Sequence, residues 1–148
     1  MEIGGYQNSN VVNGKIIGTV PQYIKIEAKS EFYTVTDMNN TFIGCSNLTV
    51  APEIPSSVTD MMETFDACTS LTTAPEIPSS VTSMDYTFYG CTSLTGNLVI
   101  NANPTGYGEC LSDASTAAGT NLVVSGTSTL LDEIIATKSE NSNITKGN

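Results

Sequence analysis

The chain has 148 residues, which fits one domain, and 39% of them are hydrophobic, enough for a modest core. Five lysines stand against fifteen acidic residues, and the net charge is −10 at pH 7. This charge excludes nucleic-acid binding, which needs clustered basic side chains to neutralise phosphates. It also disfavours a peripheral anchor on anionic lipid.

The start of the chain predicts a hairpin and no export signal. The opening residues, MEIGGYQNSN, contain neither a basic segment nor an apolar stretch, so they do not resemble a secretory signal. No run of about 18 apolar residues occurs anywhere, so no membrane-spanning segment is expected. Residues 11–18, VVNGKIIG, place an Asn-Gly pair between β-prone residues, which is typical of a β-hairpin. We expect residues 1–34 to form an N-terminal cap that includes this hairpin.

Residues 35–103 contain three copies of a 23-residue repeat. The copies at 35–57 and 58–80 agree at 16 of 23 positions without a gap, and the copy at 81–103 matches the second at 11. One copy buries too few apolar side chains to offset the entropy lost in ordering its backbone. We therefore expect the copies to stack so that equal Met, Phe, Cys, Leu and Ile side chains form continuous columns.

Each copy predicts one short helix followed by one short strand. Met61, Phe65 and Cys68 stand at i, i+4 and i+7, the spacing of one helix face, and the other copies repeat it. A threonine suits the N-cap, an aspartate suits the first turn, and a small residue marks the end. These residues are Thr36, Thr59 and Thr82, then Asp37 and Asp60, then Gly44, Ala67 and Gly90. Paired prolines, Pro52 with Pro55 and Pro75 with Pro78, limit the strand that follows to a few residues.

The C-terminal third predicts a degenerate copy, a capping helix and a tail. Residues 104–125 hold Cys110 and Leu111, and NLVI at 97–100 recurs as NLVV at 121–124, an offset of 24. The amphipathic segment STLLDEIIATK predicts a capping helix within 126–140, with Ser128 or Thr129 at its start and Lys138 at its end. Residues 141–148 are polar and are expected to fray.

The segments VTSMDYTFYGCTSLT (81–95) and CTSLTTAPEIPSS (68–80) resemble the BspA-type leucine-rich repeat of bacterial surface proteins. The likeness covers the three copies and extends through degenerate copies to about residue 125. It implies an α/β fold, a short right-handed leucine-rich-repeat solenoid with one short strand and one short helix per repeat, in a single domain over 1–148. It also implies adhesion or host-protein binding. Ala51 and Ala74 depart from the aliphatic residue that the family places before proline, and the small array offers no long concave surface.

Three cysteines, Cys45, Cys68 and Cys91, recur in register. The favoured interpretation is reduced, buried thiols that act as small apolar fillers. A disulfide is the alternative, because stacked backbones lie about 4.8 Å apart, although parallel side chains give poor disulfide geometry. No C-x-x-C pair indicates zinc.

The sequence contains few of the residues and motifs that enzymes use for catalysis. The sequence has no histidine, which removes an imidazole base, a Ser–His triad and histidine metal ligands. A Ser–Lys pair stays formally available, but no nucleophile motif and no glycine-rich phosphate loop accompanies it. We therefore expect no enzyme, no catalytic residue, no metal and no cofactor.

Exposed side chains on the copies are candidate ligand-binding residues. Glu53 and Glu76 occupy equivalent positions, where they either splay into solvent or share a cation such as calcium. Threonines beside the strands either line a binding face or simply suit strands. Two tyrosines in the third copy either form an interface or pack laterally on the C-terminal region. The full candidate set is Thr49, Glu53, Thr72, Thr73, Glu76, Tyr86 and Tyr89.

Together these patterns predict a non-catalytic surface recognition or adhesion module that binds a host protein or a glycan through the repeat face. We expect it at the cell surface or outside the cell, as part of a longer exported chain. The alternative is a phage or particle structural component, a decoration or host-contacting protein of the virion. Neither nucleic acid nor membrane insertion is expected, and the oligomeric state stays open.

Overall fold

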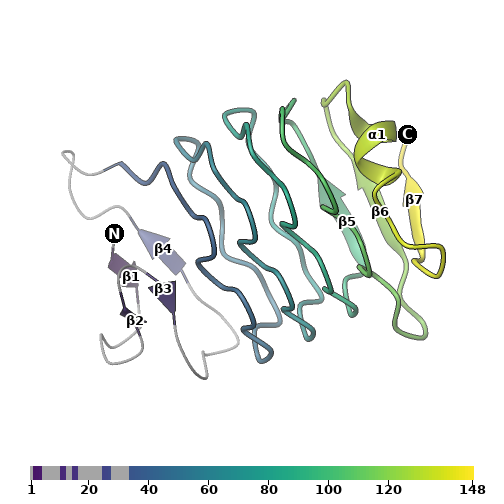
Figure 1. Cartoon of the computed structure of the whole chain (residues 1–148), viewed down its shortest axis with the longest axis horizontal. Coiled ribbons are helices and arrows are strands. Elements are labelled where there is room, and N and C mark those ends of the chain that lie inside the picture. The colour runs from purple at the N-terminus through teal and green to yellow at the C-terminus, as the bar shows by residue number, and fades with distance from the viewer. Residues whose placement is uncertain (1, 5–10, 13–14, 17–24, 28–33) are drawn as a thin grey trace.

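The computed structural model describes residues 2–4, 11–12, 15–16, 25–27 and 34–148. Its elements are β1 (Glu2–Gly4), β2 (Val11–Val12), β3 (Lys15–Ile16), β4 (Lys25–Glu27), β5 (Gly96–Val99), β6 (Leu122–Ser125), α1 (Leu131–Ile135) and β7 (Ile144–Lys146). β1 pairs with β4 and β2 with β3, both antiparallel, whereas β5, β6 and β7 form a parallel sheet in that order. From residue 34 onward the coils lie side by side in chain order (Figure 1).

The strands of the expected N-terminal hairpin are paired. Val11 lies opposite Ile16 and Val12 opposite Lys15, in the antiparallel register that a short hairpin requires. The Asn-Gly turn between them, and most of the expected cap over 1–34, lie outside the described residues.

The predicted helix in each 23-residue copy is wrong. Residues 39–44, 62–67 and 85–90 form turns, and α1 is the one helix among the described residues. The described residues form one three-stranded parallel sheet and no solenoid with a helix in every repeat. The predicted α/β leucine-rich-repeat architecture is therefore overturned, although the coils themselves do stack.

Left-handed residues explain why these segments cannot be helices. The second residue of each turn, Asn40, Glu63 or Tyr86, has a φ of 55°, 54° or 55°. The sixth residue has a positive φ as well: 68° at Gly44, 55° at Ala67 and 64° at Gly90. A right-handed helix does not pass through this region of backbone space, so the chain turns twice where one helix was expected.

The backbone hydrogen bonds give the second reason. The Phe42 N–H donates to the Thr64 carbonyl of the next coil at 2.9 Å, and the Phe65 N–H donates to the Thr87 carbonyl at 3.0 Å. Between these bonds, short turns close within the coil, such as Cys68 N–H to Phe65 O at 3.0 Å. In a helix each N–H would instead bond to the carbonyl four residues back. Pairing with the neighbouring coil thus uses the backbone N–H groups that a helix would need for its own hydrogen bonds.

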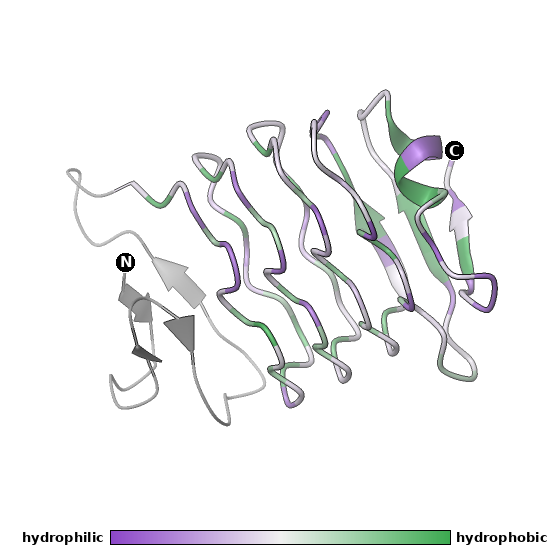
Figure 2. Ribbon diagram, in the orientation of Figure 1, coloured by the Kyte–Doolittle hydropathy of each residue, from purple (hydrophilic) through white to green (hydrophobic). Residues whose placement is uncertain are grey.

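The core consists of the predicted columns. The rings of Phe42 and Phe65 stack with centroids 5.3 Å apart, and those of Phe65 and Phe88 with centroids 5.6 Å apart. The methionine, cysteine and leucine columns beside them are buried as well, and hydrophobic and hydrophilic stretches alternate along each coil (Figure 2). These contacts confirm that equal side chains stack at 23-residue intervals. The other column members are Met38, Met61, Met84, Cys45, Cys68, Cys91, Leu48, Leu71 and Leu94, together with Ile54, Ile77 and Ile100 of the predicted isoleucine column.

The stack continues past the third copy. Ser83 and Gly106 form a parallel bridge, which places Leu111 in register with Phe88 and Ala114 in register with Cys91. Cys110 falls at the position of Thr87 and so lies outside the cysteine column. All three of these later residues, Cys110, Leu111 and Ala114, are fully buried.

The presence or absence of proline decides how much strand each copy forms. In the first two copies the extended segments make only isolated bridges, such as Val50 with Thr73. Proline lacks the N–H that a continuous ladder requires, and the third copy, which has no proline here, forms β5. β5 pairs with β6 with Leu98 opposite Val124, an offset of 26 where the sequence predicted 24. A slip of two residues keeps the same side chains inward, because strand side chains alternate with a period of two.

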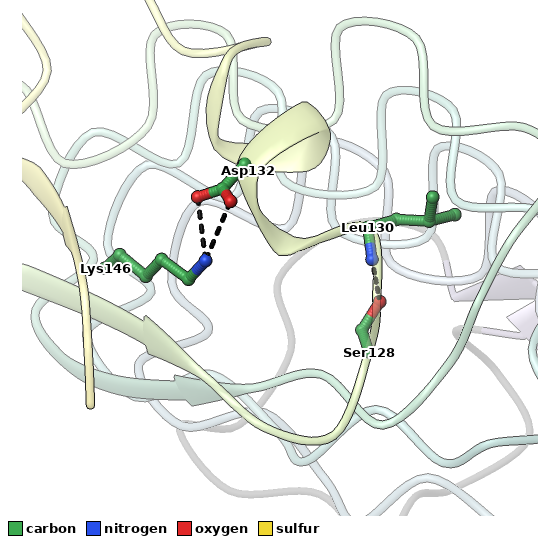
Figure 3. Close-up of polar contacts among 4 residues, drawn as sticks. All are labelled: Ser128, Leu130, Asp132 and Lys146. Carbon is green, nitrogen blue, oxygen red and sulfur yellow. Dashed lines mark hydrogen bonds and ion pairs between the residues drawn. The ribbon is translucent and has the colours of Figure 1, made fainter.

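The C-terminal end differs from prediction in both its helix and its tail. α1 spans only Leu131–Ile135 and has no side-chain N-cap hydrogen bond; Ser128 Oγ instead accepts from the Leu130 N–H at 3.1 Å (Figure 3). Lys138 does not serve the helix end, because its ammonium donates to the Ile144 carbonyl at 2.6 Å.

The tail that was expected to fray contains β7, which pairs with β6. Ile144 is buried within it, and burial of this one apolar side chain among polar residues stabilises the docked tail. Lys146 then forms an ion pair with Asp132 of α1 at 2.8 Å, so strand and helix are tied together (Figure 3).

We predict that Phe65→Ala lowers the free energy of unfolding by about 3–5 kcal/mol, because it opens a cavity between two stacked rings. Urea denaturation followed by circular dichroism measures this, with Tyr89→Ala as the exposed aromatic control. A loss below about 1 kcal/mol for Phe65→Ala would contradict the column, since a fully buried ring cannot be removed so cheaply.

Glycine and alanine exchanges at the left-handed positions should have opposite signs. Gly44→Ala is expected to destabilise and Ala67→Gly to stabilise, each by about 0.5–1 kcal/mol, because the cost of a Cβ at positive φ exceeds the opposing effect of glycine's larger unfolded-state entropy. The space around Gly44 is open, so the cost there comes from the backbone alone. Ala136→Gly, at an exposed site with a φ of −64°, is the control and should destabilise. Denaturant midpoints that move in the same direction for all three variants would contradict the turn geometry.

Candidate functional site

The turns of successive coils form one surface, which we call the turn face. It consists of the side chains at two positions of each coil: Asn40 and Ile43, Glu63 and Asp66, Tyr86 and Tyr89, and Glu109 and Ser112. Equivalent hydrogen bonds close three of these turns: Asp66 N–H to Glu63 O at 3.3 Å, Tyr89 N–H to Tyr86 O at 3.2 Å and Ser112 N–H to Glu109 O at 3.2 Å. The same backbone shape is thus repeated with different side chains.

Exposed apolar groups gather on the turn face. Ile43 is 42% exposed, Tyr86 is 41% exposed and Tyr89 is 37% exposed, and these are the exposed large hydrophobic side chains of the described residues. Single exposed hydrophobic residues need no explanation, but among the described residues all three belong to this one surface.

The two tyrosines are in contact with each other. Their ring centroids are 5.8 Å apart and the ring planes are inclined by 59°. Tyr86 holds this place although its φ is 55°, a conformation that is unusual for a bulky side chain. The alternative interpretation, lateral packing on the C-terminal region, would bury the tyrosines, but both remain exposed.

Carboxylates flank the tyrosine pair along the stack. In register, Glu63 and Asp66 stand in the preceding coil and Glu109 in the following coil. Burial, and then repulsion from Glu63, raise the pKa of Asp66 above its usual range. The neighbouring carboxylate of Glu63 thus adds to the effect of burial.

The predicted threonines lie on another segment of the coil, where they form a hydrogen-bonded row. The Thr72 hydroxyl donates to the Thr49 carbonyl at 3.0 Å, and the N–H groups of Thr72 and Thr73 donate to the same carbonyl. The Thr72 hydroxyl and the amides of Thr72 and Thr73 therefore contribute to coil stacking. This observation favours the structural interpretation of the threonines.

The predicted glutamates lie on this same segment of the coil. Glu76 accepts a hydrogen bond from Asn101 Nδ2 at 2.7 Å, and Asn101 Oδ1 accepts from Thr127. Glu53 is exposed. The partner of Glu76 is thus an amide group, which favours the interpretation without a shared cation.

The seven candidate residues therefore belong to two segments of the coil. The structure joins Tyr86 with Tyr89, and Thr49 with Thr72 and Thr73, but it does not unite the two groups. Sequence reasoning missed Ile43, Glu63, Asp66 and Glu109. Reading the positions equivalent to the tyrosines in the other copies would have found them, because residues at equivalent positions of stacked copies are neighbours in space.

The cysteines are free and buried, so the disulfide alternative is wrong. The Cys68 thiol lies 3.1 Å from the Phe42 carbonyl, and the Cys91 thiol lies 3.1 Å from the Phe65 carbonyl, both as donors. Burial raises the pKa to about 11 for Cys45 and about 12 for Cys68 and Cys110, and raises that of Cys91 too. Protonated thiols of this kind pack as small apolar groups and do not act as nucleophiles.

Metal-binding clusters and membrane-spanning helices are both absent from the described part of the chain. No group of three or more acidic or cysteine side chains is placed there to hold a metal ion. Within the same residues, no helix has the length and apolar character needed to cross a membrane.

Comparison with protein-family models, with curated proteins and with solved structures finds no match to this chain. The resemblance to BspA-type repeats therefore stays a prediction, and the helix that it implied for each repeat is absent from the described copies.

The buried thiols predict a loss of stability at alkaline pH. The folded pKa values of Cys45 and Cys68 lie above the ordinary value of 9.0, so the thiols favour folding below about pH 9. As pH rises further, the unfolded chain loses these protons first and the free energy of unfolding falls. Urea midpoints measured between pH 7 and about pH 10.5 test this, and Cys91→Ala should flatten the decline. An unchanged slope in Cys91→Ala would contradict the assignment.

Proposed function

We propose that this chain is a non-catalytic recognition module that binds its partner through the turn face. The observation that carries the proposal is that, among the described residues, the exposed large hydrophobic side chains, Ile43, Tyr86 and Tyr89, are confined to that surface. Aromatic side chains that pair an apolar ring with a polar tip are enriched where proteins bind partners.

Variation between the copies supports a binding role. The buried Met, Phe, Cys and Leu positions are identical in the three copies, whereas the turn-face positions change from Asn40 to Glu63 to Tyr86. Requirements of folding would favour small or polar residues at a left-handed position, and Tyr86 is neither. A binding role accounts for the presence of a tyrosine there.

The backbone under the turn face is rigidly held. The Tyr86 N–H donates to the Gly108 carbonyl at 2.9 Å, and the Tyr89 carbonyl accepts from the Ala67 N–H at 2.8 Å. Each tyrosine is thus fixed by a neighbouring coil, and a preordered surface loses less entropy on binding.

The ionisable groups favour binding over catalysis. The chain has no histidine, and burial keeps its cysteine thiols protonated. General acid–base and thiolate chemistry both need a group that titrates near the working pH. The predicted location at a cell surface stays a prediction.

Binding arrays test the proposal. Labelled chain is applied to printed glycans and extracellular proteins, together with Tyr86→Ser/Tyr89→Ser and with Glu53→Ala/Glu76→Ala as the control from the other segment. We expect saturable binding that the tyrosine variant weakens about tenfold or more, because aromatic anchors dominate interface energies. The glutamate variant should bind as the parent chain does.

Two outcomes contradict the proposal. One is equal loss of binding in the tyrosine and glutamate variants, which would place the interface elsewhere. The other is the absence of any saturable binder among proteins and glycans. Thermal melts of each variant establish that the substitutions leave the fold intact.

A further inference from the structure

We propose that the turn face binds the cationic side chains of a lysine- or arginine-bearing segment of a partner protein. This inference rests on the proposed recognition function and specifies its partner. Tyr86 and Tyr89 provide the aromatic platform, and the carboxylates of Glu63, Asp66 and Glu109 provide the counter-charges.

Register brings these groups together. The Glu63 N–H donates to the Asp85 carbonyl and the Tyr86 N–H donates to the Gly108 carbonyl, each at 2.9 Å, so three consecutive turns lie side by side. Paired backbones in such a stack are about 4.8 Å apart, so the coils that carry the carboxylates directly adjoin the coil that carries the tyrosines. A cation seated over the tyrosines therefore has carboxylates in the coils on both sides.

Within residues 34–148, the carboxylates on this face have no cationic partner. Among residues 34–148 the lysines are Lys138 and Lys146, and both are engaged at the C-terminal end, with the Ile144 carbonyl and with Asp132. In this part of the chain, no ion pair involves Glu63, Asp66 or Glu109. The site is thus an aromatic pair surrounded by unneutralised negative charge.

This combination favours a cation over a neutral sugar. Both ligands can stack on tyrosine, but only a cation relieves the repulsion between Glu63 and Asp66 that contributes to the raised pKa of Asp66. Arginine fits best, because its planar guanidinium stacks on rings and forms two hydrogen bonds to a carboxylate. The net charge of −10 also speeds the approach of a basic segment.

Isothermal titration calorimetry of the full chain with octa-arginine tests the proposal, with an uncharged Gly-Ser octapeptide and maltoheptaose as the other probes. We expect octa-arginine to bind and the Gly-Ser peptide not to bind. Tyr86→Leu/Tyr89→Leu removes the aromatic faces at exposed sites and should weaken binding about fivefold or more.

Two double variants with the same net charge distinguish a localised binding site from general electrostatic attraction to the chain. Glu63→Gln/Glu109→Gln should weaken octa-arginine binding about fivefold to tenfold. Glu53→Gln/Glu140→Gln removes the same charge from exposed positions off the turn face and should weaken it less than about twofold. Both variants change the net charge equally, so only a localised site distinguishes them.

The pH dependence provides an independent readout. Because the pKa of Asp66 is raised, loss of its proton adds a counter-charge as pH increases, while arginine stays charged. Affinity for octa-arginine should therefore rise through the titration of Asp66, and Asp66→Asn should flatten this rise. If Asp66 had only a structural role, Asp66→Asn would lower stability without changing the pH profile of binding.

Three results would overturn the inference: no octa-arginine binding, equal losses in the two charge-matched variants, or tighter binding of maltoheptaose than of octa-arginine. If the inference fails while the tyrosine variant still loses its array binder, the turn face remains the recognition surface for another ligand. If the tyrosine variant loses no array binder, the proposed function itself fails.

Discussion

The hydrogen bond between the backbones of adjacent coils is the interaction on which this structure depends. Alternate N–H groups, such as those of Asn40, Phe42 and Gly44, donate to carbonyls of the next coil at 2.9, 2.9 and 2.7 Å. These bonds fix the spacing of the coils, so that equal residues come into register. They also require the chain to turn through left-handed residues, which is why a segment with helical spacing is not a helix.

Buried polar side chains reinforce this pairing from inside the core. The Thr64 hydroxyl lies 2.9 Å from the Met38 carbonyl and 2.8 Å from the Met61 carbonyl, and Thr87 repeats the arrangement one coil later. Both threonines are fully buried, so their hydroxyls need these partners. The threonine before each phenylalanine thus has a structural role that apolar periodicity does not reveal.

The same regularity underlies the turn face, the surface proposed for recognition. Because the backbone repeats from coil to coil, a change of side chain at one turn alters the chemistry of the face without altering its shape. The third coil presents Tyr86 and Tyr89, and its neighbours present carboxylates. A cationic protein segment matches this pattern in both charge and aromatic character.

The sequence by itself determined the period, the identity of the buried columns, the reduced cysteines and the limit that Pro52 and Pro75 place on the strands, because these depend on side chains alone. Only the tertiary structure decided that the turns replace helices, that β5 and β6 pair at an offset of 26 and that Ile144 docks the tail. Apolar spacing reports which side chains point inward. It does not report whether a backbone N–H bonds within its own segment or to a neighbouring coil, and that choice depends on partners distant in sequence.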